Sequence, residues 1–403
     1  MRLRSLSKNL LVRVLVAIVL GILLGLFFPE WLARVFMTFN GIFSQFLGFL
    51  IPLIIVGLVT PAIADLGRGA GKWLAATAAI AYGSTIFAGL LAFLVARATY
   101  PWLLGGHSEV NGLENPEDHA LSGYFQITMP PVFDVMTALI LAFCIGVGIT
   151  FVKGDTLHKG FGELRTIVMR TVEKVIIPLL PVYIFGMFLS LTMNGQIVLV
   201  ISTFLRVVIL AFIMTVVILV IQYTVAGVVA KRNPFVMLKN MLPAYATALG
   251  TSSSAATIPV TLECTRRNGV DERVAGFTIP LCATIHLSGS TMKIVLFSMA
   301  IMTISGMPIS TGQYIGFIFL LGVTMVAAPG VPGGAIMAAV AILQSSLGFD
   351  ETAVGLMIAT YVAIDSFGTA CNVTGDGAIA LVMNRMLTGR DGKLHDVPEH
   401  TTA

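Results

Sequence analysis

The chain has 403 residues, of which 57% are hydrophobic and only 11% are charged, and its formal net charge is +4. Its mean hydropathy is +0.93. Soluble domains average about 25% charged residues, so the composition excludes a soluble globular protein and predicts an all-α protein that crosses the membrane lipid many times. The four cysteines show no paired spacing, and neither a disulfide framework nor a metal cluster is expected.

Apolar spans and charged loops alternate through the first half of the chain. The spans cover about 10–28, 37–63, 73–98, 130–152, 172–193 and 197–230. Basic residues lie in alternate loops, first Arg2, Arg4 and Lys8, later Lys153, Lys159 and Arg165 before the fifth span, and finally Lys231 and Arg232. Because Lys and Arg concentrate in cytoplasmic loops, this alternation predicts six crossings with a cytoplasmic N-terminus. The first span has no small-residue cleavage site after it, so we interpret it as retained.

The pattern changes after Lys231. The apolar segment 235–262 is interrupted by Gly250-Thr-Ser-Ser-Ser254, and basic residues return at Arg266. A segment with basic loops on both sides should enter and leave the membrane on the same face, which predicts a re-entrant hairpin. Non-helical backbone at membrane depth is tolerated where protein buries it or where it lines a cavity. The alternative is a kink in an ordinary span.

The same arrangement then recurs. A full span at about 275–304 precedes an apolar segment, 314–347, which is broken at Ala328-Pro-Gly-Val-Pro-Gly-Gly334, and a last span follows at about 354–383. A hairpin followed by a full span, repeated from the opposite face of the membrane, forms an inverted repeat. Paired broken segments at corresponding positions are typical of the binding site of a secondary transporter. The polar tail after Arg385 is expected in the cytoplasm.

The last span carries a polar stripe formed by Asp365, Thr369, Asn372 and Asp376. At 100° per residue these side chains fall within roughly a 60° arc of one helix face. A carboxylate at the centre of a membrane helix costs at least ~2.5 kcal/mol. Two of them on one face require a cation, a substrate or a water-filled cavity, and the stripe therefore predicts a transport site.

Three motifs carry a resemblance to a known family. Thr251-Ser-Ser-Ser-Ala-Ala-Thr-Ile-Pro-Val-Thr261, Gly330-Val-Pro-Gly333 and Asn372-Val-Thr-Gly-Asp376 resemble the hallmark motifs of the dicarboxylate/amino acid:cation symporters, which include the glutamate transporters. The resemblance covers essentially the whole chain. It implies eight transmembrane helices plus two re-entrant hairpins, a homotrimer in the cell inner membrane, and elevator movement of a transport domain.

The resemblance also implies a division of the chain. Residues 1–230 would form six helices, mainly scaffold, with the third and sixth spans partly in the transport domain. Residues 231–385 would form the core of the transport domain, and 386–403 a cytoplasmic tail. The implied substrate-binding residues are Ser252, Ser253, Ser254, Ser290, Val331, Gly333, Asp365, Gly368, Thr369 and Asn372. The implied sodium ligands, several through backbone oxygens, are Asp376, Asn372, Cys282, Thr284 and His286.

Within this site, Asp365 would bind the substrate's amino group, the serine tip its carboxylate, and the second hairpin tip would act as the gate. Members that carry acidic substrates have an arginine where this chain has Gly368. A guanidinium is the natural bidentate partner of a carboxylate, so its absence favours a small neutral amino acid. The alternative is an acidic amino acid or a dicarboxylate, with Lys293 supplying the positive charge.

A second departure concerns the coupling ions. Members usually show Asn-Met-Asp-Gly-Thr where this chain reads His286-Leu-Ser-Gly-Ser290. Ser288 replaces an aspartate that is a ligand of a further sodium site, so fewer sodium ions, or a proton in place of one, are expected. His286 is either a proton relay or a hydrogen-bonding residue of an unwound segment. Ser84 and Thr85 either line the cation path or pack helices.

Other functional classes fit less well. An intramembrane enzyme would need a nucleophile–base pair, for which only His286 beside Ser288 and Ser290 qualifies. A channel would need rings of pore-lining residues and no closable hairpin pair. A cation-coupled transporter is therefore expected, not an enzyme, with no organic cofactor and no nucleic-acid partner.

Overall fold

A computed structural model describes residues 10–68, 72–104, 122–133, 135–195, 197–328 and 332–387. All regular secondary structure within these ranges is helical. Val331, expected in the second hairpin tip, and residues 388–403 of the expected tail lie outside the described residues. The last helix continues two residues into the expected tail, to Leu387.

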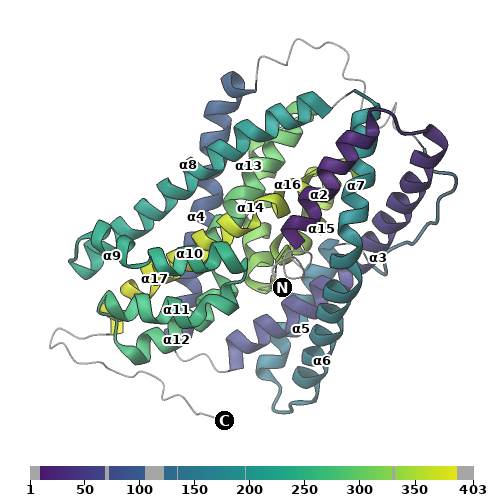
Figure 1. Ribbon diagram of the computed structural model, residues 1–403. Helices are drawn as coiled ribbons and strands as arrows, with labels where there is room; N and C mark the ends of the chain where they lie inside the picture. Colours follow the sequence, from purple (N-terminus) through teal and green to yellow (C-terminus); the bar gives the residue numbers. More distant parts are fainter. Residues whose placement is uncertain are drawn as a thin grey trace, which may run out of the picture.

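One group of helices comes almost entirely from the first half of the chain (Figure 1). It consists of α2 (Leu10–Gly25), α3 (Glu30–Arg68), α5 (Val135–Phe151), α6 (Thr156–Thr171) and α7 (Ile177–Met193). The long helix α3 packs along α5 and α6, and α2 packs along α7. Close helix approach explains two glycines here, because a Cβ at Gly21 or Gly25 would collide with α7.

The other helices pack around α13 and α17 (Figure 1). They are α4 (Lys72–Leu103), α8 (Ile197–Ala230), α9 (Pro234–Asn240), α10 (Leu242–Thr251), α11 (Ser254–Arg267), α12 (Glu272–Ile285), α13 (Ser288–Ile304), α14 (Thr311–Ala327), α15 (Gly334–Leu347), α16 (Glu351–Ala363) and α17 (Asp365–Leu387). The helices α4 and α8, which correspond to the third and sixth predicted spans, contact α13 and α17.

The apolar helices agree with a multi-pass membrane protein. Within the described residues, five helices are long and apolar enough to cross a bilayer, or six if the bent pair α16–α17 counts as one span. Two further predicted spans form the shorter helices α2 and α5, of 16 and 17 residues. These eight segments match the eight spans expected from hydropathy.

Both predicted interruptions are present as pairs of helices that pack against each other. In the first pair, α10 and α11 are joined through Ser252 and Ser253, and Ser252 adopts a left-handed backbone conformation (φ +50°). In the second pair, α14 and α15 flank residues 328–333, and Gly333 has φ +75°. Left-handed backbone is uncommon outside glycine, so the chain breaks sharply at Ser252, and Gly333 supplies the corresponding conformation directly before α15. Re-entry from one membrane face stays a prediction.

Two features differ from the expected pattern, and a third agrees with the unwound segment expected at His286. The basic loop before the fifth span is the helix α6, which continues through a π-helical turn (Val172–Ile176) into α7. The seventh span divides at His286 and Leu287 into α12 and α13. The last span bends by 62° at Ile364, between α16 and α17. The breaks in the seventh and last spans leave backbone groups without intrahelical partners. Both of these breaks lie at the polar stripe.

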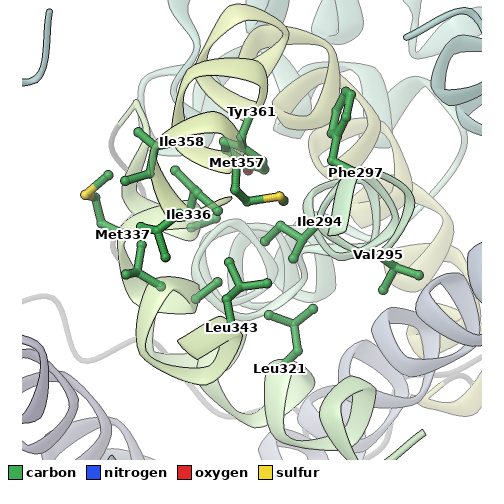
Figure 2. Close-up of a cluster of buried hydrophobic side chains, with 14 of the residues drawn as sticks. Ile294, Val295, Phe297, Leu321, Ile336, Met337, Leu343, Met357, Ile358 and Tyr361 are labelled. Carbon is green, nitrogen blue, oxygen red and sulfur yellow. The ribbon is translucent and has the colours of Figure 1, made fainter. Parts of the chain in front are cut away.

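A cluster of buried hydrophobic side chains extends to the bend and includes Ile364. Figure 2 shows side chains from α13, α14, α15 and α16 gathered together, among them Ile294, Leu321, Ile336 and Met357, with Tyr361 beside them. All of these are buried. Close packing of this kind holds the helix ends at the polar stripe in fixed positions.

Candidate substrate and cation site

The predicted polar stripe lies on one helix, α17, and is enclosed by protein. Asp365 and Thr369 are 7% exposed, Asn372 is 3% exposed and Asp376 is 1% exposed. Asp365 is the first residue of α17, directly after the bend. The structure therefore buries both carboxylates, and each needs partners.

Asp365 joins the second hairpin to the core. Its Oδ2 accepts a hydrogen bond from the backbone N–H of Gly333, at 2.7 Å, where α15 begins. Helix N-termini favour negative charge, so the carboxylate also neutralises the end of α15. Its Oδ1 lies 3.8 Å from Nζ of Lys293. Two residues that the sequence assigns to substrate and gate, Asp365 and Gly333, are in direct contact.

Lys293 is buried beside the bend, with a side-chain exposure of 1%. Its Nζ donates to the backbone oxygens of Ile364 (3.1 Å) and Asp365 (3.4 Å), and lies 4.1 Å from the ring centroid of Tyr361. A Cβ built on Gly368 would overlap Cε and Nζ of Lys293. The lysine side chain therefore occupies the space that a side chain at position 368 would need.

Asn372 binds the start of α13. Its Oδ1 accepts from the backbone N–H groups of Gly289 (2.8 Å) and Ser290 (3.4 Å), and its Nδ2 donates to Oγ of Ser290 at 3.0 Å. The first N–H groups of a helix have no intrahelical partner, so the amide caps α13. A Cβ at Gly289 would lie 2.8 Å from the backbone oxygen of Gly368, which explains the glycine at this close approach.

At the other end of the stripe, Asp376 pairs with the break between α12 and α13. Nδ1 of His286 lies 2.9 Å from Oδ1 of Asp376. Nε2 of the same ring lies 3.1 Å from Oγ of Ser84. Nε2 of Gln222 donates to Ser84 Oγ (3.0 Å) and to Ser288 Oγ (3.1 Å). Side chains from α4, α8, α13 and α17 thus converge on the imidazole.

Comparison with known families decides the identity of the fold. The model of the sodium:dicarboxylate symporter family matches residues 10–386. This chain belongs to the sodium:dicarboxylate symporter family. The expected resemblance is thereby confirmed, and with it the expectation of a transporter family, not an enzyme family.

Proteins similar to this chain include several excitatory amino acid transporters. The one from Caenorhabditis elegans is 33% identical over 150 residues, 37% of this chain and 30% of its own length. Human excitatory amino acid transporter 1 is 33% identical over 159 residues, which are 39% of this chain and 29% of the human protein. The rat protein of that name is 29% identical over 258 residues, which are 62% of this chain and 46% of the rat protein. The chain therefore spans less than half the length of the curated relatives it matches.

Some of the predicted site residues are less buried than the polar stripe. The tip residues Ser252, Ser253 and Ser254 are partly exposed, and Ser253 Oγ accepts from the N–H of Ala256 as the N-cap of α11. Thr284 is exposed, and its hydroxyl donates to Leu281 O at 2.7 Å, so its side chain does not enter the site.

Two further residues, one predicted as a sodium ligand and one predicted along a cation path, are buried. Cys282 is fully buried, and its backbone oxygen accepts the N–H of His286 at 2.9 Å. Thr85, expected with Ser84 along a cation path, is buried, and its hydroxyl has no hydrogen-bond partner within the described residues. Ser84 itself belongs to the hydrogen-bond chain around His286.

Two residues of the site were not singled out by the sequence interpretation. Tyr361 covers Lys293, and Gln222 links Ser84 to Ser288. A signal existed for Gln222, because it is the one amide side chain in the 34-residue helix α8, and polar residues inside membrane helices are expensive and functional. Tyr361 gave no comparable signal, since buried aromatics are common.

A crevice of about 340 Å³ reaches this cluster from the side of α4, α8 and α17. Its walls are mostly apolar, and Ser84 and Gln222 are its polar lining residues. Oε1 of Gln222 is buried and has no hydrogen-bond partner within the described residues.

Proposed function

We propose that this symporter couples inward sodium flow to the uptake of a small, neutral amino acid. The observation that carries the proposal is the division of one buried helix face into two ends. Asp365 meets a hairpin tip, whereas Asp376 meets the helix break at His286. Discontinuous helices that converge near paired repeats are the typical architecture of secondary-transporter binding sites.

The substrate's amino group binds Asp365 in this proposal. The carboxylate already accepts from Gly333 N–H and lies close to Lys293, so an ammonium group reaches it by displacing these partners. Displacing Gly333 moves the start of α15, which gives the second hairpin the role of a gate. The substrate carboxylate binds at the serine tip, where N–H groups at the start of α11 favour an anion.

The state of Lys293 supports a neutral substrate. Its ammonium has two backbone acceptors, a carboxylate and an aromatic ring as partners. It therefore needs no further anion, and an acidic side chain would have to break these contacts. A neutral amino acid displaces only the contact of Lys293 with the Asp365 carboxylate and leaves its backbone and ring contacts intact, and Thr369 and Asn372 complete the polar wall.

A second candidate is an acidic amino acid or dicarboxylate substrate. One observation favours it: the ammonium of Lys293 lies against Gly368, so the positive charge that acidic-substrate members place at position 368 reaches the same space from α13. The excitatory amino acid transporters among the relatives carry names that agree with this alternative.

Uptake into proteoliposomes separates these candidates. Purified protein would be tested with radiolabelled neutral amino acids, acidic amino acids and dicarboxylates, under an inward sodium gradient, an inward proton gradient, or choline. We expect sodium-driven accumulation of a neutral amino acid, with uptake largely kept in Lys293→Met. Accumulation of acidic compounds that Lys293→Met abolishes would establish the second candidate. No gradient-driven accumulation of any compound would contradict both.

Assembly and orientation follow from the resemblance to this family. We propose a homotrimer in the inner membrane with both termini in the cytoplasm. The part formed by 231–385, with α4 and α8, moves against the scaffold of the remaining early helices.

A further inference from the structure

The buried hydrogen-bond chain around His286 has a consequence for ion coupling. It contains Gln222, Ser84, His286 and Asp376, which lie on four different helical segments. The side chains of His286 and Asp376 are 0% and 1% exposed. Such a cluster is costly unless every member is satisfied.

The direction of each hydrogen bond follows from the chemistry of its groups. A carboxylate only accepts, so Nδ1 of His286 carries the proton that it donates to Asp376. Nε2 of a neutral imidazole is then an acceptor, and the Ser84 hydroxyl donates to it. The same hydroxyl oxygen accepts from Nε2 of Gln222. One donor and one acceptor thus meet at each step from Gln222 Nε2 to Asp376, and Oε1 of Gln222 is the group of this hydrogen-bond chain that has no hydrogen-bond partner within the described residues.

A cation in this space would need the same oxygens. Hard cations bind several oxygen ligands, and three of the oxygens around the imidazole are Ser84 Oγ, Ser288 Oγ and Asp376 Oδ1. Nitrogen groups of His286 and Gln222 lie within hydrogen-bond distance of all three. The imidazole ring lies between Ser84 Oγ and Asp376 Oδ1, which contact its two nitrogens, and position 288 holds a serine where the resemblance implies an aspartate.

We propose that His286, supported by Gln222, fills a sodium position of this symporter. The chain therefore binds one sodium ion fewer per protomer than it would with asparagine at 286 and aspartate at 288. This inference rests on the proposed sodium coupling. The imidazole of His286 contacts Asp376 through Oδ1. The proposal therefore leaves in place the sodium site proposed for Asp376, Asn372 and the backbone of α12.

A purely structural role for His286 would have a different consequence. If the ring only ties the helix break to α17, its replacement would lower stability without changing the number of ions bound. Counting ions therefore separates the two roles, because it does not depend on how stable each variant is.

The test is equilibrium binding of ²²Na⁺ to the purified full-length chain, measured per protomer at saturation without substrate. We expect the double variant H286N/S288D to bind one sodium ion more than the wild type. The control H158N makes the same His→Asn change on α6, in the group of α3 and α5, and should leave the count unchanged. An equal count in wild type and folded double variant would overturn the inference.

A second measurement applies if the double variant does not fold. Sodium chloride, compared with choline chloride, should then raise the melting temperature of H286N more steeply with concentration than that of the wild type. Identical sodium dependence of the two proteins would again overturn the inference. Failure of the proposed function would look different: wild-type protein would bind sodium and accumulate no amino acid, or would bind none at all.

Discussion

Asp365 and Asp376 lie on one face of α17, about 16 Å apart at 1.5 Å per residue, yet their surroundings differ in kind. Asp365 contacts a backbone N–H at a hairpin tip and the end of a long lysine side chain. Asp376 contacts an imidazole ring that is itself bound to side chains of α4 and α8. One carboxylate has exchangeable partners, and the other belongs to a closed network.

This difference shows how one helix can serve two ligands. A substrate must enter and leave, so the partners of its carboxylate must separate at small cost. The glycine and lysine contacts of Asp365 satisfy this condition. A coupling-ion site needs a fixed geometry to select its ion, and the hydrogen bonds that join several helices around Asp376 supply this geometry.

The largest effect is expected from Asp365→Ala. Hydrogen bonds to charged groups contribute about 1.5–3 kcal/mol each, so losing the ammonium partner should weaken amino-acid binding by roughly 100-fold. Sodium binding should persist, because Asp376 is untouched. Calorimetric titration with the transported amino acid, alongside ²²Na⁺ binding, measures both.

A matched carboxylate serves as the control for that variant. Asp350 N-caps α16 by accepting from Ala353 N at 2.7 Å. Asp350→Ala should cost about 1 kcal/mol of stability and leave amino-acid affinity unchanged. Equal losses of affinity in both variants would contradict a binding role for Asp365.

A smaller effect is expected from Gly368→Ala. The new Cβ would overlap Lys293, so the lysine side chain and the groups of Ile364 and Asp365 that it contacts would have to shift. Overpacking of this kind costs about 1–3 kcal/mol, and we expect roughly 10-fold weaker amino-acid binding. Added to Gly368→Ala, Lys293→Met should give less than the summed effect of the two changes, because these residues share a contact.

The control here is Gly316→Ala on α14, where a Cβ would meet nothing within 4 Å. Alanine in an exposed helix interior should stabilise by about 0.5–1 kcal/mol without changing affinity. Strict additivity of Gly368→Ala and Lys293→Met would show that the lysine does not occupy the space beside Gly368.

The smallest effect is expected from Gly333→Ala. Gly333 has φ +75°, and a side chain there costs about 1–2 kcal/mol. Because its N–H donates to Asp365, strain should weaken amino-acid binding a few-fold. Gly348→Ala, at φ +71° on the other end of α15, should lower the melting temperature similarly without affecting binding. If binding falls equally in both, the hairpin tip does not act through Asp365.

Hydropathy and helix periodicity were enough to predict much of this architecture. The spans, both hairpin breaks and the shared face of the stripe on α17 follow from patterns of 20 to 30 residues, which depend little on neighbouring helices. The alternation of charge predicts a loop around Lys159 and Arg165, whereas these residues lie on the amphipathic helix α6. Its charges obscured a helix that packs only one face against α3.

The partners of the stripe could not be predicted from the sequence. The overlap of Lys293 with the space at Gly368 depends on the bend at Ile364, whose carbonyl the lysine binds. The contact of His286 with Asp376 joins residues 90 positions apart. Long-range contacts of this kind depend on how helices pack, and a single sequence carries no direct signal for them.

The most direct test of the two-ended site is amino-acid binding to Asp376→Asn, measured over a series of sodium concentrations. The account predicts that the binding curve shifts to higher sodium while the maximal amino-acid binding stays close to that of the wild type. A loss of amino-acid binding at every sodium concentration, as expected for Asp365→Ala, would contradict the division of α17 into a substrate end and an ion end.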